Sequence, residues 1–124
     1  MSGNQKLGKT GEETALRYLE RKGYACLGRN VRVGHDELDL VMRDGAVTVF
    51  VEVKLRKPGV SGSAAVDRGK RRRISRAAVV YMMNTGGLDR PARFDVVELA
   101  FDGAQMNIHH IEDAFPLERG RTFV

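Results

Sequence analysis

The sequence has little of what marks a secreted or membrane protein. Its 124 residues include one cysteine, Cys26, which cannot form a disulfide within the chain. Residues 1–9 are polar and lack the apolar core of a signal peptide. The longest apolar stretch, residues 46–53, is much shorter than the roughly 20 residues that a membrane helix needs. A cytoplasmic protein that does not contact membranes is therefore expected.

Residue patterns that hold zinc or nucleotides are also missing. His35, His109 and His110 are not spaced with Cys26 as the ligands of a structural zinc site usually are. No glycine-rich loop precedes a predicted helix in the pattern that binds phosphate, so ATP use has no support. The tyrosines fall on positions typical of a core rather than of a platform for stacking bases. Sequence-specific recognition of bases is therefore not expected.

What the sequence does have is a balance of apolar and charged residues. With 42% hydrophobic and 30% charged residues, the composition is typical of a folded globular protein. The length predicts a single domain over residues 1–124, in which residues 116–124 form a loose C-terminal tail. The net charge of +5 favours a polyanionic partner such as nucleic acid, although many basic surfaces serve only solubility. A specific site has to decide between the two.

Apolar periodicity and turn residues predict seven elements in the order α-β-β-β-α-β-β. The first helix ends before Gly23 and begins either at the capping residue Thr10 or earlier, near Leu7. Asp67 is the predicted N-cap of the second helix, which runs to about Asn84. The predicted strands cover residues 24–33, 37–43, 46–55, 93–101 and 105–111. This order favours a mixed α/β sheet flanked by helices.

The third predicted strand carries charged residues within an apolar run. Glu52 and Lys54 are two residues apart, so on a strand they point to one face, while Val51 and Val53 point to the other. Burying such charges on a central strand is costly unless they are paired or bind a metal. The two residues therefore either lie at the end of the sheet or serve a chemical purpose.

The preceding predicted strand supplies another carboxylate. It reads Glu37-Leu38-Asp39-Leu40, so its two acidic side chains share a face opposite the two leucines. Asp44-Gly45 is a strong signal for a two-residue hairpin turn, which would place Asp39 opposite Phe50 and diagonal to Glu52. Asp39, Glu52 and Lys54 are then expected to converge on one face of the sheet.

Two carboxylates and a lysine in one pocket suit the hydrolysis of a phosphodiester bond. Carboxylate oxygens are ligands that Mg²⁺ prefers, and a cation stabilises the negative charge that develops on the phosphate. The alternative for Glu52 and Lys54 is a surface pair at the edge of the sheet, worth up to about 1 kcal/mol. The spacing alone leaves both interpretations open, because Glu-x-Lys is a short pattern that often occurs by chance.

A series of short motifs runs through nearly the whole chain. In order, they are Gly11-Glu12, Gly23-Tyr24, Arg29-Asn30, Glu37-Leu38-Asp39-Leu40, Phe50-Val51-Glu52-Val53-Lys54, Ala65-Val66, Lys70, Arg93-Phe94-Asp95-Val96-Val97, His110-Ile111 and Ala114-Phe115. In this pattern the chain resembles the YraN-type family of bacterial proteins. That family is similar to the PD-(D/E)xK nucleases, which include restriction endonucleases and archaeal Holliday junction resolvases. The resemblance implies a restriction-endonuclease-like α/β fold.

The resemblance also implies roles for individual residues. Glu12, Asp39 and Glu52 would supply carboxylates to a Mg²⁺ or Mn²⁺ ion, and Lys54 would be the motif lysine that orients or activates water. Glu12 flanks the apolar stripe of its helix, so it either leans toward the cleft or is an ordinary solvated glutamate. The chain departs from the family pattern at Asp36, where glycine is usual.

The second predicted helix carries a dense group of basic residues. Lys70 lies on its apolar stripe near the N-terminus, where it either reaches the cleft or passes along the edge of the core. The residues expected to contact a phosphate backbone are Lys70, Arg71, Arg72, Arg73, Arg56 and Lys57. The last two lie on an exposed loop predicted over residues 56–63. A solvated helix face is the alternative for the arginines.

These patterns together predict a Mg²⁺- or Mn²⁺-dependent deoxyribonuclease. It would recognise the shape of its substrate, such as branched or damaged DNA, through the phosphate backbone. A homodimer would suit the symmetric cleavage of two strands. The alternative is a non-catalytic nucleic-acid-binding module whose carboxylates are structural. A third interpretation, a scaffold for protein interactions, predicts no salt-dependent affinity for DNA.

Overall fold

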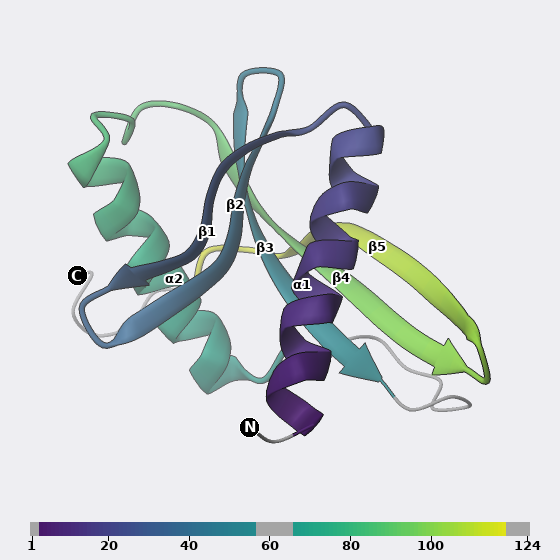
Figure 1. Ribbon diagram of the computed structural model, residues 1–124. Coiled ribbons are helices and arrows are strands. Elements are labelled where there is room, and N and C mark those ends of the chain that lie inside the picture. Colours follow the sequence, from purple (N-terminus) through teal and green to yellow (C-terminus); the bar gives the residue numbers. More distant parts are fainter. Residues whose placement is uncertain (1–2, 57–65, 119–124) are drawn as a thin grey trace.

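Two helices lie on opposite faces of one five-stranded sheet (Figure 1). The computed structural model describes residues 3–56 and 66–118, and within them the side chains of residues 10–56 and 66–118. The helices are α1 (Gly3–Arg21) and α2 (Arg68–Asn84). The strands are β1 (Ala25–Val33), β2 (Asp36–Asp44), β3 (Val47–Arg56), β4 (Ala92–Asp102) and β5 (Gln105–Phe115). The predicted order α-β-β-β-α-β-β is confirmed.

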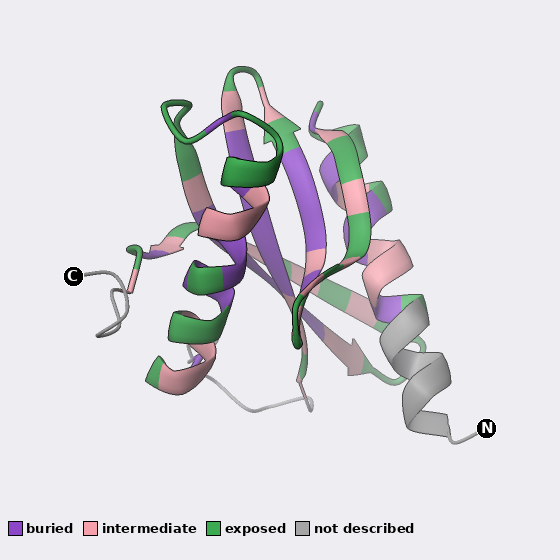
Figure 2. Ribbon diagram, turned by 90° about the vertical axis from the view of Figure 1, so that its left-hand side faces the viewer, coloured by how far each residue is buried: buried purple, intermediate pink, exposed green. Residues whose placement is uncertain are grey.

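The sheet is mixed because one crossover connects its two parts. Its strands lie in the order β1-β2-β3-β4-β5. β1, β2 and β3 form an antiparallel meander, and β4 and β5 form an antiparallel hairpin. β3 and β4 run parallel, since the chain crosses over through α2 before it re-enters the sheet. The buried residues therefore gather on the middle strands of the sheet, as Figure 2 shows.

Alternate residues of β3 face two separate hydrophobic cores. Val51 packs in the core under α1, together with Leu19. Phe50 packs in the core under α2, together with Ile74. Because side chains alternate along a strand, Glu52 follows Phe50 onto the face that α2 covers. The candidate acidic residue of β3 therefore points toward α2.

The hairpin between β2 and β3 turns one residue later than predicted. Asp44 pairs with Val47, so the turn is Gly45-Ala46 rather than Asp44-Gly45. Gly45 has a φ of 60°, a conformation that glycine adopts without steric cost. The glycine of the predicted turn is therefore used, but at the first position of the turn instead of the second.

This register changes how the two strands bring their acidic residues together. Phe50 pairs with Val41, so the predicted pairing of Asp39 with Phe50 is wrong. Regular pairing of β2 with β3 ends one residue before Asp39 and Glu52. The two acidic residues are therefore level with each other, not diagonal.

β2 bends at Asp39, which overturns a second expectation. Leu38 lies in the core under α2 and Leu40 in the core under α1, so the two leucines do not share a face. At the bend, Asp39 Oδ2 accepts a hydrogen bond of 2.9 Å from the backbone N–H of Val53. The carboxylate is thereby fixed between β2 and β3, just beyond their last regular pair.

The ends of the remaining elements differ little from the prediction. α1 begins at Gly3, which favours the earlier of the two predicted starts over Thr10. Asp67 caps α2 as predicted, since its Oδ1 accepts a hydrogen bond of 2.9 Å from the Lys70 backbone N–H. β5 continues to Phe115, beyond its predicted end. In the part of the chain that the structure describes, no helix is long and apolar enough to span a bilayer.

Candidate active site

The carboxyl groups of Asp39 and Glu52 meet on the face of the sheet that α2 covers. Asp39 comes from the bend in β2 and Glu52 from β3, and the two carboxyl groups are hydrogen-bonded to each other. We call these two residues the acid pair. Glu52 is only 7% exposed, so the alternative of a surface ion pair is wrong for this residue.

Burial and mutual repulsion favour a proton on the acid pair. Burial is the largest effect, because it disfavours the charged form of a carboxyl group. Together with the charge of Asp39, burial raises the pKa of Glu52 to about 7. Burial also raises the pKa of Asp39, although hydrogen bonds from Val53 and Glu52 oppose the rise. A divalent cation at this position would replace the proton and remove the repulsion.

Lys70 reaches the acid pair from α2. Its Nζ lies 3.5 Å from Glu52 Oε1, and its charge opposes the rise in pKa of both carboxyl groups. The Lys70 side chain is 36% exposed, so the ammonium group is open to solvent as well. A pocket of about 300 Å³ is lined by His35, Asp36, Glu37, Asp39, Lys70, Arg73 and Ile74. The structure thus places Lys70 in the cleft beside Asp39.

Glu12 approaches the same end of the sheet from α1. The helix lies close to the strands because the preceding residue, Gly11, has no side chain. A Cβ atom on Gly11 would lie 3.1 Å from Leu55 and 3.3 Å from Leu99, tighter than most such contacts. The glycine therefore lets α1 bring Glu12 down to the end of β3.

Glu12 is held near the acid pair but does not touch it. Its Oε2 accepts a hydrogen bond of 2.7 Å from Asn30 Nδ2. Burial raises the pKa of Glu12, as do the charges of Asp39 and Glu37, while the Asn30 hydrogen bond opposes the rise. Within residues 3–56 and 66–118, no three histidine, cysteine or acidic side chains are close enough together to hold one metal ion. Glu12 is therefore a neighbour of the acid pair in this conformation.

Lys54 lies on the same face of β3 as Glu52, but farther along the strand. It is level with Glu98 of β4. The pKa of Asp67 is lowered first by the backbone N–H of Lys70 and also by nearby charges, which include Lys54. Lys54 is therefore beside the N-terminus of α2, and the lysine in ion-pair contact with Glu52 is Lys70.

The arginines of α2 divide into two groups. Arg72 and Arg73 are exposed, and Arg73 lines the pocket beside the acid pair. Arg71 turns toward the protein: its Nε donates to the Val66 carbonyl at 2.7 Å, and its guanidinium lies 5.4 Å from the centre of the Phe115 ring. Arg72 and Arg73 thus point into solvent, whereas Arg71 contacts Val66 and Phe115.

The two basic residues predicted on the loop have different outcomes. Arg56 is the last residue of β3, and its Nε lies 3.3 Å from an oxygen of the buried Glu98. The predicted start of the loop at residue 56 is therefore wrong. Lys57 lies outside the described residues.

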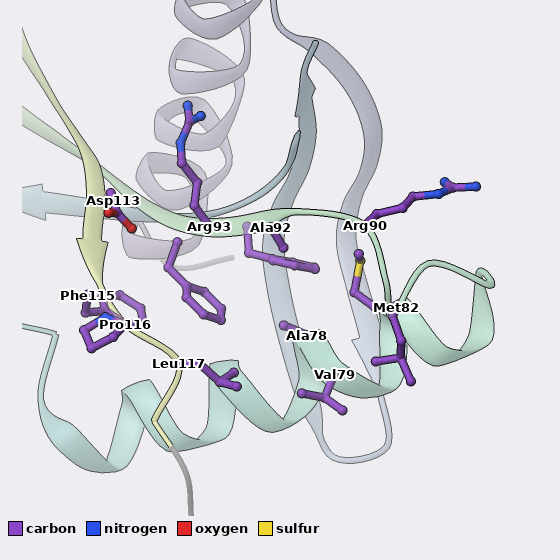
Figure 3. A pocket seen from close by; sticks show the side chains of 13 residues that line it. Ala78, Val79, Met82, Arg90, Ala92, Arg93, Asp113, Phe115, Pro116 and Leu117 are labelled. Carbon is purple, nitrogen blue, oxygen red and sulfur yellow. The ribbon is translucent and has the colours of Figure 1, made fainter. Parts of the chain in front are cut away.

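An apolar pocket lies farther along α2 (Figure 3). It has a volume of about 260 Å³, and its lining includes Ala78, Met82, Phe94, Phe115 and Leu117. Catalytic pockets need converging polar groups, and the acid pair and Lys70 are not in this lining. The pocket beside Asp39 and Lys70 is therefore the candidate active site.

A protein-family model, Uncharacterised protein family UPF0102, matches residues 11–99. The chain belongs to this family. The match covers both residues of the acid pair, Glu12, Lys54 and Lys70. The predicted resemblance to the YraN-type family is confirmed.

Relatives named UPF0102 protein are similar to the chain over most of its length. The relative from Geobacter metallireducens is 46% identical and covers 92% of this chain and 95% of its own. The relative from Halorhodospira halophila is 49% identical over 87% of this chain and 85% of its own. Among solved structures, SfsA of Pyrococcus furiosus in complex with Ca²⁺ aligns with 88% of this chain and 62% of its own, at 15% identity and a TM-score of 0.35.

This UPF0102 protein also has a buried ionic network that the sequence patterns did not predict. Asp95 of β4 is fully buried and lies 3.0 Å from Arg93 Nε and 2.7 Å from His110 Nε2, and it accepts a hydrogen bond of 3.0 Å from the Asp113 backbone N–H. Burial alone would raise the pKa of Asp95, but the hydrogen bonds from His110 and Arg93 outweigh it and lower the pKa. We call these side chains, with Tyr24, the Asp95 network.

The Asp95 network joins β4 and β5 to the end of α1. Arg93 Nη2 donates to the Tyr24 hydroxyl at 2.7 Å, and Lys22 Nζ lies 2.9 Å from His110 Nδ1. The network lies on the α1 face, because Asp95 pairs with Val51. A carboxylate inside an apolar strand was the available signal, the same one that identified Glu52.

Proposed function

We propose that the protein is a divalent-metal-dependent endonuclease that hydrolyses phosphodiester bonds in DNA. The acid pair is the observation that carries this proposal. Asp39 and Glu52 are mostly buried and hydrogen-bonded to each other, Asp39 lines a pocket that Lys70 also lines, and Lys70 is in ion-pair contact with Glu52. A perturbed carboxyl pair beside a polar pocket is typical of a catalytic site and is costly in a site with no function.

The residues present fit Mg²⁺ or Mn²⁺. Both ions prefer hard oxygen ligands, and the acid pair supplies them where two negative charges repel each other. Asp39 and Glu52 would hold the ion, and Glu12 would assist them. When bound, the ion supplies Lewis acidity toward the phosphate and lowers the pKa of water.

The remaining groups act on the substrate itself. Lys70 carries a positive charge at the acid pair, where it would neutralise the phosphate being cleaved. Lys54, on the same strand face, would orient water or a neighbouring phosphate. Arg72 and Arg73 are exposed, and Arg73 lines the pocket; both would bind the phosphate backbone without reading bases. We extend the same proposal to the recognition of branched or damaged DNA by its shape. We also propose that the enzyme is a homodimer.

A non-catalytic nucleic-acid-binding module is the second candidate. One observation favours it: among the described residues, no third ligand lies close enough to complete a metal-binding group. In a module of this kind, the acid pair would remain protonated and would contribute only to the packing of the protein.

A cleavage assay distinguishes the two functions. Linear, flapped, gapped and four-way-junction DNA would be incubated with Mg²⁺ or Mn²⁺ and the wild-type protein, Glu52→Ala or Lys54→Ala. The nuclease predicts metal-dependent products that both substitutions reduce strongly. DNA binding without cleavage by the wild type would support the module instead. Cleavage that neither substitution changes would contradict the assigned site.

The exposed arginines of α2 are expected to set the salt dependence of DNA binding. The double variant Arg72→Ala/Arg73→Ala should lower the slope of log K against log salt by about 1–2, because each phosphate contact releases roughly one counterion. Binding would be measured by fluorescence anisotropy in metal-free buffer. Arg21→Ala/Arg43→Ala removes the same charge from exposed positions elsewhere and should leave the slope nearly unchanged. Equal slopes for the two double variants would contradict the prediction.

A further inference from the structure

Asn30 of β1 has an unusual backbone conformation close to the candidate active site. Its φ is 47°, in the left-handed region that asparagine tolerates better than most residues with a side chain. Regular pairing of β1 with β2 passes over it, since Arg29 pairs with Leu40 and Val31 with Leu38. Strained backbone of this kind often accompanies a functional role. The Asn30 side chain is therefore a candidate for a functional role.

The Asn30 side chain bridges two carboxylates from different elements. Its Nδ2 donates to Glu12 Oε2 of α1 at 2.7 Å and to Glu37 Oε1 of β2 at 3.3 Å. A carboxamide nitrogen has two N–H groups, so it is able to serve both acceptors at once. The amide is uncharged. An aspartate at this position would supply neither of the two donors.

The two bridged carboxylates interact electrostatically with Asp39. The charges of Asp39 and Glu37 raise the pKa of Glu12, and the charge of Glu37 raises the pKa of Asp39. Without the amide between them, Glu12 and Glu37 would repel each other and move apart. Asn30 thus holds acidic groups together that would otherwise separate.

We propose that Asn30 is a positioning residue of the candidate active site, which holds Glu12 and Glu37 beside Asp39 before a divalent cation binds. The inference rests on the proposed function, because it concerns the same metal site. Asn30 acts only through the carboxylates that it orients. Mutation of a residue that hydrogen-bonds to a metal ligand typically lowers the affinity for the metal by about 10–100-fold.

One substitution tests the Asn30 amide separately from its backbone conformation, and a second substitution is its control. Asn30→Gly removes the amide but keeps the backbone, because glycine adopts a positive φ readily. Glu13→Gln is the matched control. Glu13 accepts a hydrogen bond of 2.7 Å from Arg29, so it makes the neighbouring contact between α1 and β1 without reaching the acid pair.

Calorimetry of Mn²⁺ binding to the full chain tests the inference. Asn30→Gly is expected to bind Mn²⁺ about tenfold more weakly than the wild type, and Glu13→Gln as tightly as the wild type. In the cleavage assay, Asn30→Gly should need more Mn²⁺ for half-maximal rate, with unchanged affinity for DNA in metal-free buffer. A purely structural role of Asn30 would lower the thermal stability of Asn30→Gly and leave its Mn²⁺ affinity unchanged.

A measurement on the wild-type protein covers the case in which Asn30→Gly does not fold. The side-chain amide signals of Asn30 in an NMR spectrum should shift when Mg²⁺ is added, because the bridged carboxylates respond to the ion. If the wild type binds Mn²⁺ but these signals do not move, or if Asn30→Gly binds Mn²⁺ as tightly as the wild type, the inference alone is overturned. If the wild type binds no Mn²⁺, the proposed function is overturned and the inference with it.

Discussion

Glu52→Gln is expected to abolish metal-dependent cleavage and, at the same time, to stabilise the metal-free protein at pH 8. Cleavage should fall by a hundredfold or more, since losing a metal ligand costs at least as much as the roughly 10–100-fold loss of a ligand's partner. Stability should rise because glutamine removes a buried charge that Asp39 repels. The substitution is therefore expected to lower the rate of cleavage and to raise the stability of the metal-free protein.

The pH dependence follows from the raised pKa of Glu52. The group has an ordinary value of 4.5 in the unfolded chain and a pKa of about 7 in the folded protein, where burial and Asp39 raise it. The folded state thus binds the proton more tightly, so its stabilising effect is complete below pH 4.5 and is lost as the pH rises through 7. The loss is on the order of 3 kcal/mol, because each unit of pKa difference corresponds to about 1.4 kcal/mol. Glutamine has no such titration, so the stability of the variant should lack this fall.

Urea unfolding from pH 4 to pH 8 measures the effect, with and without Mg²⁺. Adding Mg²⁺ at pH 8 should stabilise the wild type by mass action and leave Glu52→Gln unchanged. Glu20→Gln, at an exposed position of α1, is the control and should follow the wild-type curve. A Glu52→Gln protein that is less stable than the wild type at pH 8 would contradict the prediction.

Asp95→Asn is expected to destabilise the protein by about 3–5 kcal/mol, the usual cost of breaking a buried ion pair. The carboxylate interacts with Arg93, His110 and the Asp113 backbone N–H. An amide has one oxygen to accept with and brings two donors of its own, so part of the Asp95 network would lose its partner. The Arg93 side chain is only 17% exposed, so its charge would be left partly buried.

Acid should remove this difference between wild type and variant. Hydrogen bonds from His110 and Arg93 lower the pKa of Asp95 below its ordinary 3.8, so its stabilising effect is present above that pH and is lost as the pH falls through the folded value. Urea unfolding at pH 7 and pH 3 measures the change, with Asp102→Asn at an exposed position as control. A loss at pH 7 within about 0.5 kcal/mol, typical of a surface substitution, would show that the network contributes little.

The site could be predicted as far as local alternation determines it. A carboxylate in an apolar strand identified Glu52, and helical spacing placed Lys70 toward the core; the structure puts both beside Asp39. The hairpin register was missed by one residue. Asp44 is the last strand residue rather than part of the turn, and its side chain binds Arg93 of β4 at 3.1 Å. A local turn pattern carries no information about a partner so distant in the chain.

Features built from distant contacts were beyond the sequence patterns. The Asp95 network joins β4 and β5 to residues 22–24, which follow α1, and Asn30 joins α1 to β2, so neither has a fixed spacing to detect. The bend at Asp39 was missed because period-2 alternation assumes a regular strand. The density of basic residues beside the site predicts a phosphate contact for Arg71, and the contacts of its side chain with Val66 and Phe115 carry no signal in the sequence.

The parallel pairing of β3 with β4 bears on how such a protein could evolve. It sets Asp95 level with Val51, so two buried acids sit on adjacent strands but face opposite sides of the sheet. One acid is saturated by donors and anchors the fold, while the other is left protonatable and costs stability. Loss of the Glu52 carboxyl group during evolution is therefore expected to yield a more stable protein without the proposed activity, whereas loss of the Asp95 carboxylate would be removed by selection for folding. The proposed activity could then be lost and regained during evolution while the protein folds at every step.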